Sequence, residues 1–384
     1  MNKNRRQRNK TSTVTKFRHE ELLKELEKKE VVIQELQNAY SSTLHAYEKI
    51  LNSYSWKFIA SLRKVLGIKH PPRTFNLSFE LPPANVLKVR KKRTKPLRLD
   101  RITQVPFENR LSNLTIPCTL GEKNRIIDNF RIWDTIHHPI ISEDINPPSL
   151  VVLCNGDPNE EFENDIEQAF KLRNMSRFFS SMEFLYCRLH GESDVYVEEA
   201  ADFLKYPQGT KAGPNNQFFI GMRKLYKFNG FTFFMETDCT PIKNGWLEQL
   251  MNLVSQSESF WIKGSVYRGV SPMDDRFKTH INGNAIYASG DYQFQTFLEN
   301  ELYPYLMDKI TNGCPWLAYD CAIDFYMNEA STYTDMDKWK KLQNIRHLIT
   351  YTDYIRNYSG DTEKKNKLKG YNSNEMPNTY IIHG

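Results

Sequence analysis

The residues best suited to chemistry in this sequence are two carboxylates, Glu236 and Asp238, separated by one threonine. Hard carboxylate oxygens are ligands for Mg²⁺ and Mn²⁺, which commonly use one or two protein carboxylates together with phosphate oxygens. A cation held in this way can bridge the two phosphates of a nucleotide-sugar and stabilise the charge that develops on a departing diphosphate. An isolated acid-x-acid triplet is also common in solvated turns, so the pair by itself leaves both interpretations open.

The elements around the acidic pair indicate how it is positioned. The pair directly follows an apolar run at residues 231–235, which predicts a buried strand. Upstream, residues 149–154 and 182–187 predict two further strands, and residues 161–177 and 216–228 predict helices between them. This alternation predicts an α/β domain with a Rossmann-like, mostly parallel sheet and helices on both faces. In such sheets ligands bind at the carboxyl ends of the strands, which is where the acidic pair stands.

Charge is distributed unevenly along the 384 residues. Residues 1–100 carry 23 Lys and Arg against 9 Asp and Glu, whereas the remaining residues carry 29 against 37. The basic character therefore belongs to the N-terminal part of the chain. We divide the sequence into four parts: a disordered basic tail (residues 1–17), a helical and coiled-coil segment (18–68), a proline-rich basic connector (69–148) and the α/β domain (149–384).

The N-terminal part contains segments suited to association. Residues 18–51 predict a polar helix whose apolar positions recur every seven residues, as a short coiled coil or a lone solvated helix would show: Leu26, Ile33, Tyr40 and Tyr47. Residues 53–66 mix aromatic, aliphatic and basic side chains, which fits a peripheral membrane contact, docking on a partner or packing on the α/β domain, whereas the coiled coil suits self-association. The basic run at residues 89–95 lacks interleaved aromatic residues, so a solvated linker is favoured over a nucleic-acid site.

The cysteines and the N-terminus bear on the cellular compartment. Six cysteines are scattered without a C-x-x-C pair, and several stand within apolar runs. This favours reduced, buried thiols over disulfides or a zinc site. The basic N-terminus is not followed by the apolar stretch of a secretory signal, and no run approaches the length that spans a bilayer. We therefore expect a cytoplasmic protein that reaches a membrane only at its inner surface.

Several segments together resemble the core of GT-A-fold glycosyltransferases with a variant DxD motif. They are Gly213-Pro214-Asn215-Asn216, Phe233-Phe234-Met235-Glu236-Thr237-Asp238, Gly245-Trp246-Leu247, and the runs at residues 260–265, 280–287 and 316–320. The resemblance makes residues 280–287 the loop that contacts the donor sugar and residues 316–320 the start of the acceptor-side helix. The coiled coil with Ser55-Trp56-Lys57 and Leu62-Arg63 is also similar to a segment of some bacterial polysaccharide glycosyltransferases, although Ser61 replaces a proline.

The resemblance implies a metal-dependent glycosyltransferase. Such an enzyme moves a hexosyl or pentosyl group from a nucleotide-diphosphate sugar to a hydroxyl of a glycan or glycoconjugate, with Mn²⁺ or Mg²⁺ as cofactor. The common motif begins with Asp where this chain has Glu236, so Asp238 is the favoured metal ligand and Glu236 the second. Family members often complete the metal sphere with a histidine near the C-terminus, which here implies His383.

The resemblance also implies nucleotide contacts at two predicted element boundaries. Asn155 and Asp157, after the strand at residues 149–154, are expected to contact the base or the ribose. Asp157 precedes Pro158, so an ordinary turn explains it equally well. Asn216 is expected to reach the nucleotide from a helix start, where helix capping is the alternative.

Sugar contacts are implied further along the chain. Asn282 and Asn284 offer amides to sugar hydroxyls, and Gly283 permits close backbone approach, although a plain turn also explains this Asn-Gly-Asn sequence. Asp320 is the expected general base of an inverting enzyme, or holds hydroxyls in a retaining one. Asp324, one turn later, is the fallback for that role.

A second class of function stays open from the sequence. The basic leader and coiled coil also suit a non-catalytic scaffold that recruits a partner or a membrane and keeps a sugar-nucleotide-binding fold. An Asp238→Ala substitution separates the two hypotheses, because only an enzyme would lose metal-dependent donor turnover.

Overall fold

The computed structural model describes residues 106–136, 146–197, 205–269, 278–329, 342–358, 366–368 and 376–384. The chain forms two units, Met1–Thr94 and Lys95–Gly384, and every described residue belongs to the second. The predicted basic tail and coiled coil therefore lie outside the described residues. All six cysteines lie within them, and none of the six forms a disulfide with another. No helix in these ranges is both long enough and apolar enough to cross a bilayer.

The described residues form a seven-stranded sheet in the order β3-β2-β1-β4-β7-β6-β8. The pairs β3–β2, β2–β1, β1–β4 and β6–β8 are parallel, while β7 runs antiparallel to both of its neighbours. The predicted α/β class with a mostly parallel sheet is thus confirmed. The strand bounds are β1 Leu111–Cys118, β2 Ser149–Cys154, β3 Met182–Tyr186, β4 Phe231–Phe234, β6 Ile262–Gly264, β7 Ile286–Tyr287 and β8 Ile349–Tyr351.

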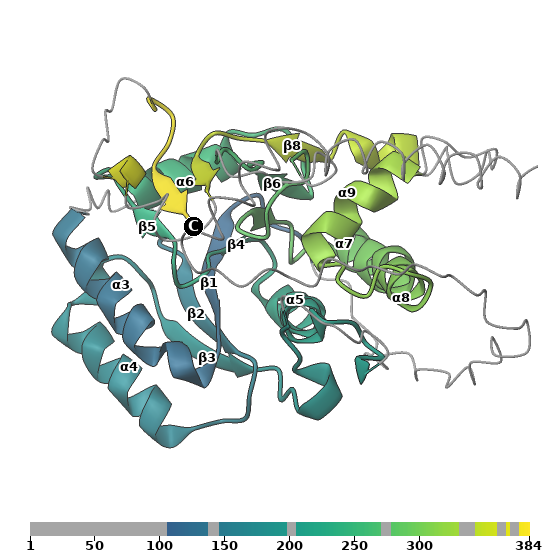
Figure 1. Ribbon diagram of the computed structural model, residues 1–384. Helices are drawn as coiled ribbons and strands as arrows, with labels where there is room; N and C mark the ends of the chain where they lie inside the picture. The colour runs from purple at the N-terminus through teal and green to yellow at the C-terminus, as the bar shows by residue number, and fades with distance from the viewer. Residues whose placement is uncertain are drawn as a thin grey trace, which may run out of the picture. The chain divides into compact units, whose positions relative to one another are not determined.

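Helices cover both faces of this sheet, as predicted (Figure 1). On one face α3, α4 and α6 pack together, and Trp133 of α3 meets Trp246 of α6 with ring centroids 5.4 Å apart. On the other face α5 lies so close to β2 that a Cβ on Gly221 would come within 2.4 Å of Leu153. The helix bounds are α3 Lys123–Ile136, α4 Glu160–Leu172, α5 Ala212–Leu225, α6 Trp246–Ser255, α7 Tyr292–Phe297, α8 Tyr303–Thr311 and α9 Tyr319–Glu329.

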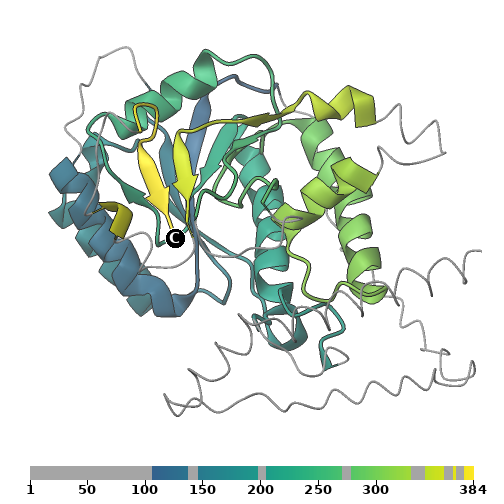
Figure 2. The same cartoon turned by 45° about the horizontal axis from the view of Figure 1, so that its top comes forward.

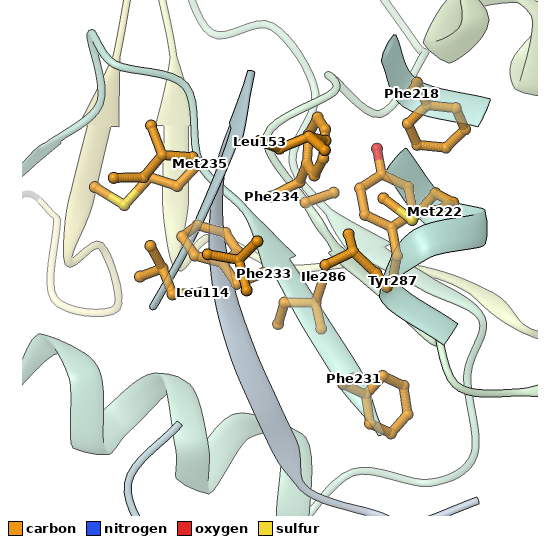
Figure 3. Close-up of a cluster of buried hydrophobic side chains, with 14 of the residues drawn as sticks. Leu114, Leu153, Phe218, Met222, Phe231, Phe233, Phe234, Met235, Ile286 and Tyr287 are labelled. Atoms are coloured by element: carbon orange, nitrogen blue, oxygen red, sulfur yellow. The ribbon is translucent and has the colours of Figure 1, made fainter. Parts of the chain in front are cut away.

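Aromatic residues fix the position of β4, the strand that ends at the acidic pair. Successive side chains of a strand point to opposite faces, and Phe234 meets Phe218 of α5 and Tyr287 of β7 with centroids 6.0 and 6.2 Å apart. Phe233 points to the opposite face, on the side of Leu114 (Figure 3). Burial of a phenylalanine contributes roughly 1.5–3 kcal/mol. The end of β4 is therefore firmly placed in the core.

The domain boundary predicted at residue 149 is wrong. Both β1 and α3 lie within the stretch interpreted as a connector, yet β1 is a central strand with all eight residues buried. Two features hid it: Pro117 near its end, and polar residues that interrupt its apolar pattern. Two of these polar residues are hydrogen-bonded to each other inside the core, because the Thr115 hydroxyl donates to Asn113 Oδ1 at 2.7 Å.

A second sheet brings a distant part of the chain to the acidic pair. In it, β10 (Ile381–His383) runs antiparallel to β5 (Thr240–Pro241) and parallel to β9 (Ile355–Asn357). Figure 2 shows β10, in yellow, beside β9. Because β5 begins two residues after Asp238, this pairing delivers residue 383 to the turn that carries the acids. The same register places His383 opposite Asn357.

Candidate functional site

The acidic pair occupies a turn at the carboxyl end of β4. The backbone N–H of Cys239 donates to the carbonyl of Glu236 at 3.0 Å and closes the turn. The central residue, Thr237, is buried: its hydroxyl donates to Glu122 Oε1 at 2.6 Å, and its carbonyl accepts from Asn129 Nδ2 at 2.8 Å. Thr237 is thus anchored to Glu122 and to α3, which follow β1 in the chain. This anchoring leaves the two flanking carboxylates free to converge on a third residue.

That third residue is His383. Its Nε2 lies 3.0 Å from Glu236 Oε2 and 3.3 Å from Asp238 Oδ1. Ligands at about 2.1 Å from one cation, at right angles, stand about 3 Å apart. The two carboxylates and the imidazole thus have the spacing and the chemistry of a divalent-cation site. The structure brings together all three residues that the sequence analysis proposed as metal ligands.

A neighbouring amide sets the orientation of the imidazole. Asn357 Nδ2 donates to the carbonyl of Ser265 at 2.9 Å, so its Oδ1, 3.0 Å from His383 Nδ1, is an acceptor. The Nδ1 of His383 therefore carries a proton, and Nε2 is the nitrogen directed at the carboxylates. Metal-ligating histidines usually have such a partner on the second ring nitrogen, which fixes the tautomer and the ring orientation.

The acids also determine the protonation of His383 when no cation is bound. Burial of the ring disfavours the charged form, but the hydrogen bonds to Asp238 and Glu236 outweigh burial and raise the pKa of His383 to about 10. The imidazolium then supplies the positive charge that two adjacent carboxylates require. A bound cation would take over this role from the proton.

Removing the amide that orients His383 is expected to weaken metal binding without removing a ligand. We expect Asn357→Ala to lower Mn²⁺ affinity about 10- to 100-fold, the usual effect of losing such a partner. Titration calorimetry with Mn²⁺ measures this change, and a melting curve verifies the fold. Asn252→Ala, at an exposed position of α6, is the matched control and should bind as the wild type does. Unchanged affinity in Asn357→Ala would show that the amide does not orient the ring.

The Asn-Gly-Asn sequence supports the acidic pair from the side of β7. Asn284, which is fully buried, accepts from the backbone N–H of Glu236 at 2.7 Å and donates from Nδ2 to Glu236 Oε2, also at 2.7 Å. Its Nδ2 also donates to Asn282 Oδ1 at 2.9 Å. Asn284 thus holds both the backbone and the carboxylate of Glu236. The contact with a donor sugar implied for these two amides stays a prediction.

Gly283 connects the same loop to the acid that begins α9. Its N–H donates to Asp320 Oδ2 at 3.2 Å, and its carbonyl accepts from the Tyr287 hydroxyl at 2.9 Å. A Cβ at this position would lie 2.2 Å from the hydroxyl of Tyr319, whose ring stacks on α5. Any side chain would therefore push the loop away from α9. The loop at residues 282–284 thus contacts Glu236 at one end and Asp320 in its middle.

Asp320 has a well-defined hydrogen-bonding environment. Besides the amide of Gly283, it accepts from the N–H of Cys321 at 2.8 Å, and His280 Nε2 lies 3.5 Å from its Oδ2. Burial acts to raise the pKa of Asp320, but His280 and the two amides outweigh burial and hold the pKa below its usual value. Asp324 lies one turn further on, and its pKa is raised by burial. Whether Asp320 removes a proton or positions hydroxyls stays a prediction.

Sequence analysis missed three residues that shape the site. His280, Asn357 and Glu122 contact the predicted residues from elements that are distant in the chain. His280 stands in the segment singled out for the resemblance, but nothing in its local sequence indicates a pairing with Asp320. The other two lack any local signal.

The residues expected to bind the nucleotide all contact one short segment, residues 190–194. Asn155 donates to both carboxylate oxygens of Asp194 at 2.8 and 3.0 Å, Asp157 lies 3.4 Å from His190, and Asn216 donates to the carbonyl of Ser193 at 2.9 Å. All three therefore contact the segment at residues 190–194. The capping alternative for Asn216 is wrong, because α5 begins four residues earlier, so Asn216 stands within the helix and its side chain is buried. The nucleotide contacts themselves stay predictions.

The fold and this cluster define a mixed α/β protein with a candidate divalent-cation site at the edge of its sheet. No protein-family model matches the chain, and no curated protein matches it. Among solved structures, it is similar to galactosyltransferase LgtC in complex with donor and acceptor sugar analogues, at 9% identity over 71% of this chain and 86% of that one, with a TM-score of 0.38.

Two further structures show a similar likeness. Mouse xyloside xylosyltransferase 1 is 10% identical over 73% of this chain and 98% of that one, with a TM-score of 0.38. The glycosyltransferase GlyE of Streptococcus pneumoniae TIGR4 is 10% identical over 71% of this chain and 54% of that one, with a TM-score of 0.31.

Proposed function

We propose that this chain is a GT-A-type glycosyltransferase that transfers a hexosyl or pentosyl group from a nucleotide-diphosphate sugar to a hydroxyl of a glycan or glycoconjugate. The observation that carries the proposal is the convergence of Glu236, Asp238 and His383 at the carboxyl edge of a parallel sheet. Ligands bind at this edge in α/β folds. Two carboxylates that converge there on one imidazole are suited to hold a divalent cation beside a diphosphate.

Glu236, Asp238 and His383 would hold the cation. When bound, it supplies positive charge to the diphosphate as that group departs. The set of two oxygen ligands and one nitrogen ligand favours Mn²⁺ over Mg²⁺, because Mg²⁺ prefers an all-oxygen sphere. The third residue distinguishes this cluster from an ordinary acidic turn, which has no buried imidazole directed at it.

The remaining residues position the reacting groups. Asn284 fixes the Glu236 carboxylate, and the loop at residues 282–284 offers its backbone to the donor sugar. Asp320 holds that loop through the amide of Gly283. A carboxylate whose pKa is lowered, and which already accepts two backbone hydrogen bonds, is a weak proton acceptor. We therefore assign Asp320 to positioning the loop and to holding hydroxyls.

The test is a panel of nucleotide-diphosphate sugars incubated with the full chain. We expect one donor class to release its nucleoside diphosphate in the presence of Mn²⁺, to stop doing so with EDTA, and to resume when Mn²⁺ is restored. Slow release to water is expected even without an acceptor. A non-catalytic scaffold would instead bind a donor without turning it over. No turnover of any donor, with intact metal binding, would overturn the enzymatic proposal in favour of that scaffold.

Association through the N-terminal part accompanies this proposal. The coiled coil of residues 18–51 and the amphipathic stretch at 53–66 are proposed to bring the enzyme to a second copy or to a membrane surface. Both segments lie outside the described residues, and the cytoplasmic location also stays a prediction.

A further inference from the structure

A cavity opens at the carboxyl ends of β6 and β8, which pair in parallel. Its volume is about 430 Å³. Two short segments that follow these strands line it, together with residues that precede His280. We call it the β6–β8 cavity, and its lining residues are Ser265, Val266, Arg268, Lys278, Thr279, Tyr351, Thr352 and Asp353.

Residues in the wall of the β6–β8 cavity contact or adjoin the partners of His383 and Asp320. The carbonyl of Ser265 accepts from Asn357, which orients His383, and from the N–H of Asn282 at 3.1 Å. Thr279, which also lines the cavity, immediately precedes His280, the partner of Asp320. Through Ser265 the cavity therefore contacts Asn357, the partner of His383, and adjoins the loop at residues 282–284, so a substrate bound in the cavity would lie beside the loop proposed to hold the donor sugar.

The lining has the chemistry of a site for a charged sugar. Tyr351 is 62% exposed, and its ring offers a flat apolar face on which the C–H face of a sugar can lie. The Tyr351 hydroxyl donates to the carbonyl of Thr279 at 3.4 Å. The hydroxyls of Thr279 and Thr352, which unlike Ser265 are at least partly exposed, can bond to sugar hydroxyls.

Two of the described lining residues of the β6–β8 cavity, Arg268 and Lys278, are cations. Among the same described residues the acid is Asp353, which lies 3.1 Å from Nη2 of Arg268. Both members of this ion pair are about half exposed. A guanidinium has five N–H donors, so Arg268 can keep Asp353 and still bind a second anion.

We propose that the β6–β8 cavity binds the acceptor glycan, and that Arg268 and Lys278 select acceptors carrying an anionic group, a phosphate or a carboxylate, beside a sugar ring stacked on Tyr351. The proposal rests on the proposed glycosyl transfer, because it places the second substrate of that reaction. Sequence analysis gave no indication of it, since the three residues come from separate segments.

Direct binding tests the proposal without a donor. The probes are the methyl glycosides of common hexoses, each as the neutral sugar, the 6-phosphate and the 6-carboxylate, titrated into the full chain by ligand-observed NMR. We expect at least one charged form to bind about tenfold tighter than its neutral counterpart, as a gained charge-assisted hydrogen bond would give. Comparing the 6-phosphate with the 6-carboxylate identifies which anion is preferred.

Variants locate the effect. Arg268→Ala and Lys278→Ala should each remove most of the preference for the charged form, whereas Arg131→Ala and Lys171→Ala, at exposed positions of α3 and α4, should retain it. Tyr351→Ala should weaken the neutral and charged sugars alike, with the exposed Tyr292→Ala as its control. Melting curves of all variants verify folding.

The outcomes separate this proposal from the enzymatic one. Equal binding of neutral and charged sugars, or a preference that survives both Arg268→Ala and Lys278→Ala, would overturn the acceptor assignment. Release of nucleoside diphosphate to water by the wild type, measured in parallel with Mn²⁺, reports only on the proposed transferase. If that release occurs without charged-sugar preference, only the acceptor assignment fails.

Discussion

Replacing Asp238 by alanine is expected to lower metal-dependent release of nucleoside diphosphate roughly 10³-fold, the scale on which the loss of one charge-stabilising group acts. The reason is geometric: Asp238 and Glu236 meet at one imidazole nitrogen, and removal of either leaves a two-ligand set. The measurement is turnover of the donor identified in the panel, at saturating Mn²⁺, together with Mn²⁺ affinity by calorimetry.

Two companion variants make this result interpretable. Asp238→Asn keeps the size of the side chain but loses its charge, so it should resemble Asp238→Ala in turnover. Asp308→Ala, at an exposed position of α8, removes an acid elsewhere and should behave as the wild type. Turnover retained by both Asp238 variants would remove the cation site from the proposed mechanism.

The second large effect is expected from Asn284→Asp, which exchanges only an amide for a carboxylate. The new carboxylate would place an oxygen where Nδ2 now donates to Glu236 Oε2 at 2.7 Å. Two facing carboxylates repel, and the new one, at the fully buried position 284, would have no access to solvent. We expect about a 10²-fold loss of donor turnover and a loss of stability on the order of 2–4 kcal/mol.

Chemical denaturation and the donor assay measure these two effects. Asn244→Asp is the matched control, because Asn244 is exposed and its Oδ1, which an aspartate keeps, accepts from the N–H of Gly245. Its stability and turnover should match those of the wild type. Should Asn284→Asp retain full turnover, Glu236 would not need the support that the structure gives it.

Local patterns predicted much of the fold. The strands at residues 149–154 and 182–187 were placed within one residue, because short apolar runs between turns are typical of buried parallel strands. β1 was missed because Asn113 and Thr115 interrupt its apolar pattern, and the sequence does not reveal that these two side chains hydrogen-bond to each other in the core. A proline count across residues 69–148 then outweighed the weak apolar signal of this strand.

The site residues that could be predicted are those with a recognisable local sequence pattern or a family resemblance. Glu236 and Asp238 could be found from an acid pair after a strand, and His383 from a family resemblance. Asn357 could not, because only the pairing of β9 with β10 sets it beside His383. The combination of Arg268 with Tyr351 in the β6–β8 cavity was equally hidden, because only the pairing of β6 with β8 brings their segments together.

The small sheet of β5, β10 and β9 has a consequence for the energetics of the whole domain. Its central strand ties residues near the end of the chain to the turn after β4, and the three proposed ligands straddle that junction. A cation seated there acts as a reversible cross-link across a long stretch of polypeptide. Each tenfold excess of the ion over its dissociation constant would then add about 1.4 kcal/mol to the free energy of unfolding. The edge of the sheet that carries the three proposed ligands would therefore be most stable at high concentrations of the cation.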